Sequence, residues 1–237
     1  FNPKPEEDIN EEFITIPANN VKPLNITAQE IKPGLVRLKS INGDLPEVGW
    51  FYVAKGYNSE NRLVPAVRIY SSLNIAVENV NVYHAGGMGL IAEKCTNINL
   101  DKFNVRLREG TKRHLSTTAD ATHFVNCKGL VKIENCLFEN QLDDATNIHG
   151  TYVEVTKVIN NKTVEVKLGH FQQRDFDFAQ ADDTLTIVEM KSFAKKKDFI
   201  LAKIERTNEK YYQLTFKDNI LNDIKIGDLI DNSNWYP

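Results

Sequence analysis

The chain has 237 residues, of which 41% are hydrophobic and 26% are charged. This composition is typical of a globular protein and excludes wholesale disorder. The 29 Lys and Arg residues against 32 Asp and Glu residues give a net charge of -3. We therefore expect no nucleic-acid partner, because phosphate binding calls for a basic excess.

No apolar run approaches the roughly 18 residues that a membrane helix needs, so we expect no membrane span. The chain opens with Phe1-Asn2-Pro3, which is neither an initiator Met nor a signal peptide, and we expect it to begin downstream of a cut. Its 53 Val, Ile and Thr residues against 14 Ala predict an all-β protein. Cys95, Cys127 and Cys136 form no C-x-x-C pair, so we expect buried free thiols.

Residues 1–64 are predicted to form a β-barrel-like module. Apolar and polar residues alternate over residues 9–64 between turn signals, which favours antiparallel strands. The turn signals are Lys32-Pro33-Gly34, Asn42-Gly43-Asp44 and Asn58-Ser59-Glu60.

Residues 65–150 contain a repeat that predicts a right-handed parallel β-helix. Three segments that begin at Ile75, Ile98 and Val131 are each apolar at positions one, three, six and eight, as expected for two strands joined at a corner. Their spacings of 23 and 33 residues suit one turn, or rung, of such a helix. The longer spacing contains a polar loop over 106–118. We expect the three leading residues to stack in one inward ladder, and the many asparagines to allow stacked Asn ladders.

A second series of strands keeps the same step: 89–92, 121–124 and 145–148. By parity, Phe124 and Ile148 should point inward, while His123 and Asn147 should face outward. Residues 151–237 lack the repeat, and turns at 160–162, 207–209 and 226–228 predict a second β-barrel-like module. The two modules would flank the β-helix or be inserted into it.

The sharpest chemical signal is the tripeptide Asp-Ala-Thr, which occurs at 120–122 and again at 144–146, one rung later. Because rungs lie about 4.8 Å apart, Asp120 and Asp144 should stack at one corner, with Asp143 beside them. Carboxyls this close raise the pKa of one of them, which leaves a proton donor beside an ionised base. Glycoside hydrolysis uses such a pair. A turn-capping role is the alternative for these aspartates.

His123, Asn147 and His149 are predicted to line a groove beside the acidic corner. An amide and two imidazoles can donate and accept hydrogen bonds, as sugar hydroxyls require. We therefore expect these three residues to bind substrate.

The stretches 85–92, 116–127 and 143–150 resemble glycoside hydrolase family 110, the secreted bacterial α-1,3-galactosidases of the blood-group-B type. The resemblance implies a β-helix with β-barrel insertions and an inverting exo-hydrolase that removes terminal α-1,3-linked galactose from glycans. Its catalytic aspartates fall on Asp120, Asp143 and Asp144, with no metal and no cofactor. It also implies a periplasmic or secreted location and leaves a homodimer open. A complete enzyme carries more rungs, so we expect this chain to be a fragment.

Two other functions use the same residues. A polygalacturonase-like pectin hydrolase would need cations for uronate groups, which Arg106, Arg108, Lys112 and Arg113 could supply. A non-catalytic carbohydrate-binding β-helix would bind sugar but release no monosaccharide. The sequence leaves open which aspartate is the acid and whether linear or branched, fucosylated galactosides are preferred.

Overall fold

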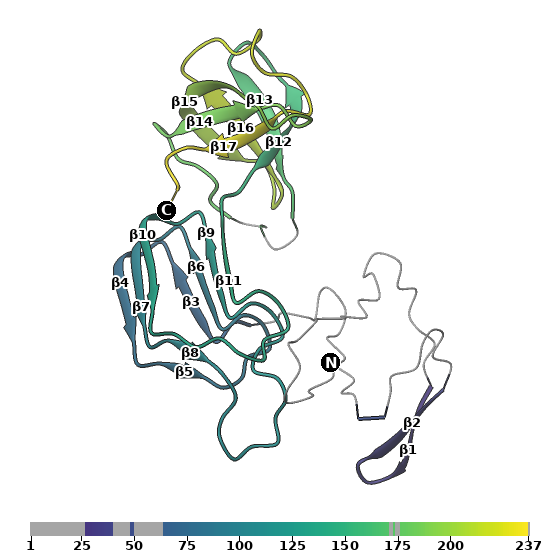
Figure 1. Cartoon of the computed structure of the whole chain (residues 1–237). Coiled ribbons are helices and arrows are strands. Elements are labelled where there is room, and N and C mark those ends of the chain that lie inside the picture. Colours follow the sequence, from purple (N-terminus) through teal and green to yellow (C-terminus); the bar gives the residue numbers. More distant parts are fainter. Residues whose placement is uncertain (1–26, 40–47, 50–63, 171–172, 174–175, 237) are drawn as a thin grey trace. The chain divides into compact units, whose positions relative to one another are not determined.

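The computed structural model describes residues 27–39, 48–49, 64–170, 173 and 176–236 (Figure 1). The chain divides into two compact units, Phe1–Asn61 and Arg62–Pro237. The described residues form strands β1 to β17 and no α-helix, which confirms the all-β class. Within the described ranges, no helix is long and apolar enough to cross a membrane.

In the first unit, one hairpin is described. Strands β1 (Thr27–Lys32) and β2 (Leu35–Lys39) pair antiparallel. Gly34 has φ of 78°, which suits the predicted turn at 32–34 because glycine adopts positive φ without a Cβ penalty. The predicted turns at 42–44 and 58–60, and with them most of the expected first module, lie outside the described residues.

Nine strands of the second unit pair in parallel and belong to three sheets. The sheet orders are β11-β9-β6-β3, β10-β7-β4 and β5-β8. Two circuits, β3-β4-β5 and β6-β7-β8, pass through the three sheets in the same order. The third circuit repeats the first two sheets with β9 and β10 and meets the third through a parallel bridge between Phe138 and Val105. Strands of successive circuits pair side by side, with one register shift between β7 and β10. The strands are β3 (Val67–Tyr70), β4 (Leu73–Glu78), β5 (Asn81–Val82), β6 (Leu90–Glu93), β7 (Thr96–Asp101), β8 (Asn104–Val105), β9 (Thr122–Val125), β10 (Lys128–Glu134) and β11 (Thr146–His149).

The predicted inward ladder is confirmed. Ile98 pairs with Ile75 on one side and with Val131 on the other. Ile98 is buried, and its two neighbours pack partly buried against the same core, which also contains Leu90 and Phe124. Each fully buried side chain of this size stabilises the fold by about 1.5–3 kcal/mol. The stack of similar residues therefore holds successive circuits in register.

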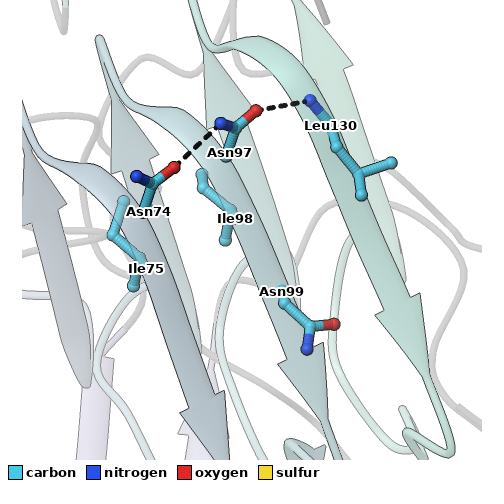
Figure 2. Close-up of a pocket in the computed structure, with 6 residues that line it drawn as sticks. All are labelled: Asn74, Ile75, Asn97, Ile98, Asn99 and Leu130. Carbon is cyan, nitrogen blue, oxygen red and sulfur yellow. Dashed lines mark hydrogen bonds between the residues drawn. The ribbon is translucent and has the colours of Figure 1, made fainter.

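An asparagine ladder joins three circuits where β4, β7 and β10 begin (Figure 2). The Asn97 side chain donates a hydrogen bond to Asn74 Oδ1 over 2.8 Å, and its own Oδ1 accepts one from the Leu130 backbone N–H over 3.1 Å. Both asparagines have φ near 55°, a conformation that Asn tolerates better than most residues. Gly129 leaves the space that Asn97 needs, because a Cβ there would lie 2.3 Å from Asn97 Oδ1. Stacked asparagines were expected from the sequence.

Residues 151–236 contain a closed antiparallel barrel with the order β12-β13-β16-β15-β14-β17. The predicted turns at 160–162 and 207–209 join β12 to β13 and β15 to β16, and the turn at 226–228 precedes β17. Alternating residues of these strands fill one apolar core. The strands are β12 (Val153–Val158), β13 (Thr163–Leu168), β14 (Thr184–Val188), β15 (Lys195–Arg206), β16 (Tyr211–Phe216) and β17 (Leu229–Asn232).

The three cysteines are free thiols, as predicted. Cys95 and Cys127 are buried, whereas Cys136 is only partly buried. Each thiol donates a hydrogen bond to a backbone carbonyl: Cys95 to Glu93 over 3.3 Å, Cys127 to Ala92 over 3.5 Å and Cys136 to Glu134 over 3.1 Å. They therefore serve as small core residues of the parallel sheets.

Candidate functional site

Asp120 and Asp144 occupy equivalent places on neighbouring circuits. Thr146 pairs with Thr122, two residues after each aspartate. The Ala121 N–H donates to the Asp144 carbonyl over 2.9 Å, and the Gly89 N–H donates to the Asp120 carbonyl over 2.9 Å. The backbones of the two aspartates therefore lie about one strand spacing, ~4.8 Å, apart. Asp143 is adjacent, and its Oδ1 accepts the Asp144 N–H over 3.2 Å.

The side chain of Asp120 is buried against an imidazole. Asp120 Oδ2 lies 2.5 Å from His123 Nδ1, and only 3% of the aspartate side chain is exposed. His123 Nε2 lies 2.7 Å from His149 Nε2, with the two rings edge to face and their centroids 4.8 Å apart. His149 Nδ1 in turn lies 2.7 Å from the Gly150 carbonyl oxygen. A continuous chain of contacts thus runs from a buried carboxyl to an exposed imidazole.

Asp144 has a different partner in the same position. Its Oδ2 accepts a hydrogen bond from Asn147 Nδ2 over 3.2 Å, and the aspartate is exposed. Both aspartates contact the side chain three residues later, but Asp120 meets an imidazole where Asp144 meets an amide. An amide cannot take up a proton near neutral pH, so the two carboxyls face different proton chemistry.

The predicted parity holds on β9. Phe124 is buried in the core, while His123 is displaced to the opposite face and reaches Asp120. Ile148 pairs with Phe124 in register but is 44% exposed. It is exposed because β11 is the edge strand of its sheet in the described structure, so no further strand covers it.

Gly89 positions this corner, although our interpretation of the sequence gave it no role. A Cβ at Gly89 would lie 2.5 Å from the Ala121 carbonyl oxygen and 2.6 Å from Val105 Cγ2. Only glycine therefore lets the circuit that contains residue 89 approach the backbone just after Asp120. In the sequence, only the cluster of glycines at 86–89 marks this position. A cluster of glycines does not indicate which backbone atoms approach it.

The three arginines among the cationic loop residues considered for uronate binding make contacts within the protein. The guanidinium groups of Arg106 and Arg108 lie 6.0 and 5.8 Å from the ring centroid of Tyr83. Arg113 donates to His84 Nδ1 over 3.1 Å, since an arginine has no acceptor. These contacts give the arginines a structural role and do not single out a carboxylate ligand. Among the described residues, no three His, Cys, Asp or Glu side chains are grouped to hold a metal ion.

The sequence is similar to a family model and to several α-1,3-galactosidases. Residues 163–230 match the family model "GLAA-B beta-barrel domain II". Over 88% of the present chain, the sequence is 34% identical to alpha-1,3-galactosidase A of Shewanella woodyi. Over 74% of the present chain, it is 35% identical to alpha-1,3-galactosidase B of Bacteroides fragilis. It is 27% identical to alpha-1,3-galactosidase B of Bacteroides thetaiotaomicron over 89%.

The chain spans only part of these relatives, covering 34%, 31% and 34% of their respective lengths. The similarity nevertheless extends over most of the present sequence, and the family model falls on the barrel strands β13 to β17. The resemblance to glycoside hydrolase family 110 is thereby confirmed: the chain is homologous to the α-1,3-galactosidases over about a third of their length.

Proposed function

We propose that this chain is the catalytic part of an exo-acting glycoside hydrolase that removes terminal α-1,3-linked galactose from glycans. The observation that carries the proposal is the corner where Asp120 and Asp144 repeat on neighbouring circuits with different partners. The homology to proteins named α-1,3-galactosidases supplies the substrate class. Aspartates that merely cap turns would need neither the buried imidazole contact nor the repetition.

In this mechanism Asp120 acts with Asp143 or Asp144 as general acid and general base. One carboxyl protonates the glycosidic oxygen while the other activates a water molecule on the opposite face of the sugar. Inversion calls for carboxyls roughly 6.5–9.5 Å apart, more than a bare strand spacing of ~4.8 Å. The two catalytic carboxyls must therefore point away from each other. Asp143, next to Asp144 in the chain, is the alternative partner for Asp120 and would give a different separation.

His123, Asn147 and His149 are proposed to bind the galactose hydroxyls beside these carboxyls. Asn147 and His149 lie on β11, and His123 lies on the neighbouring strand β9 in register with Asn147. The Asn147 amide offers both a donor and an acceptor. The ring nitrogens of His123 and His149 already contact Asp120, each other and the Gly150 carbonyl, so an imidazole would bind a hydroxyl by exchanging one of these contacts. Substrate binding would therefore engage two neighbouring strands of one sheet.

The scaffold is proposed to be a right-handed parallel β-helix over residues 65–150, followed by a separate barrel module over residues 151–237. The repeated order of three parallel sheets on successive circuits supports the β-helix. The closed order of β12 to β17 supports the separate module. A β-helix suits this chemistry because equivalent corners stack, so carboxyls from successive circuits come together.

The experiment is an assay of galactose release from an α-1,3-linked galactoside, with polygalacturonate as the alternative substrate. Both this chain and a protein extended to the length of the relatives are tested. We expect the extended protein to release galactose and to leave polygalacturonate intact. Binding of the galactoside without release would show a carbohydrate-binding module, and release of galacturonate would show a pectin hydrolase. Either result would refute the proposal.

A further inference from the structure

The contacts of Asp120, His123 and His149, hereafter the proton array, fix how many protons these groups hold. The Gly150 carbonyl can only accept, so the contact at 2.7 Å requires a proton on His149 Nδ1. The two Nε2 atoms lie 2.7 Å apart, and two lone pairs cannot face each other at that distance, so one proton lies between them. The 2.5 Å contact between His123 Nδ1 and Asp120 Oδ2 requires a third proton.

Three contacts therefore need three protons. An ionised carboxylate and two neutral imidazoles together carry only two, one on each ring. We propose that the proton array holds one additional proton and is electrically neutral, with His149 as a positioning residue that retains this proton through Gly150. The additional proton lies within hydrogen-bonding distance of Asp120, a proposed catalytic carboxyl. The catalytic meaning of this proton therefore rests on the proposed function.

The charged groups around the proton array favour the additional proton. Asp143 and Asp144 precede β11, and Asp144 contacts Asn147, which pairs with His123. From the barrel, Asp231 Oδ1 lies 3.6 Å from where a Cβ on Gly150 would stand. Burial raises the pKa of Asp231. These groups are all acidic, and negative charge stabilises a protonated imidazole.

Substitutions in the chain can separate this proposal from a purely structural contact. In Asp120→Asn the new amide can donate to His123 Nδ1, so His123 can carry its single proton on Nε2 and His149 can carry its own on Nδ1. All three contacts are then satisfied with both imidazoles neutral. The matched control is Asp144→Asn, the same change one circuit later, which leaves the three contacts in place.

The test is nuclear magnetic resonance of the full chain with nitrogen-15 histidine and carbon-13 aspartate labels at about pH 7, where an unperturbed imidazole is mostly neutral. We expect three protons in the wild type, seen either as one imidazole protonated on both nitrogens or as a protonated Asp120. Asp120→Asn should lose one of them, and Asp144→Asn should keep all three. An ionised Asp120 beside two neutral imidazoles in the wild type would overturn the proposal.

A second readout uses the extended protein and its pH profile. His149→Phe removes the contact between the Nε2 atoms, so Asp120 and His123 then need only one proton and no remaining contact requires the additional one. The alkaline limb of galactose release should therefore move to lower pH. An equal loss at every pH would contradict the role given to His149. If the extended protein releases no galactose at all, the proposed function fails. The proton count is decided separately, by the nuclear magnetic resonance measurement on the chain.

Discussion

Gly89→Ala is expected to destabilise the protein and to disturb the corner that contains Asp120. The new Cβ would lie 2.5 Å from the Ala121 carbonyl oxygen and 2.6 Å from Val105 Cγ2. Ordinary contacts of a Cβ begin at 3.4 Å, so the overlap with the carbonyl oxygen is about 0.9 Å. That oxygen belongs to the backbone of the neighbouring circuit, one residue before β9, and cannot rotate away. Overpacking of this kind typically costs about 1–3 kcal/mol, and we expect the upper half of that range.

The assay is thermal and urea unfolding of the chain, monitored by circular dichroism. In a protein of this size 1 kcal/mol corresponds to about 2–4 °C in Tm, so a loss of about 2–3 kcal/mol should lower Tm by about 4–12 °C. Gly86→Ala is the matched control, because a Cβ at Gly86 would have no atom within 4 Å and the φ of Gly86 is not positive. An equal Tm for the two variants would show that the parallel circuits do not approach as closely as described.

Two further predictions concern the scaffold. Asn97→Ala removes both hydrogen bonds of the asparagine ladder. At about 0.5–1.5 kcal/mol per bond, the free energy of unfolding measured by urea titration should fall by about 1–3 kcal/mol. A change below the error of the titration would contradict the ladder. Tyr70 has its pKa raised to about 12 by burial and by its hydrogen bond to Asp177. Because the folded state holds this proton more tightly than the unfolded state, the stabilisation is present below about pH 10 and is lost as the pH rises towards 12. Tyr70→Phe should flatten the dependence of unfolding free energy on pH in this range. An unchanged dependence would show that Tyr70 is not the group responsible.

The repeat made the parallel sheets predictable from the sequence. Ile75, Ile98 and Val131 must enter the same core, so selection for burial leaves a regular apolar spacing that can be recognised in one sequence. The stacking of Asp120 and Asp144 followed from the same spacing. The strand β3 lies inside the range of 65–150 predicted for the β-helix, but its own position was not predicted because it precedes the first recognised repeat.

The contacts of the site were less predictable than its residues. His123 and His149 were expected to line the groove, yet their mutual contact depends on how two rings lean across neighbouring strands, which spacing does not encode. The role of Gly89 depends on the position of the Ala121 carbonyl. Both features are set by side-chain direction and by the local approach of backbones, and neither leaves a periodic signal.

The most direct measurement of the central claim is galactose release by the extended protein carrying Asp120→Asn, Asp143→Asn or Asp144→Asn. Loss of a proton-transfer group commonly lowers the rate by about 10²–10⁴-fold, so Asp120→Asn and at least one of the other two should fall by that factor while unfolding as the wild type does. Asp218→Asn, at an exposed position on the barrel, serves as the control and should keep the full rate. Near-normal release by all three corner variants would contradict the account and leave these aspartates as turn caps.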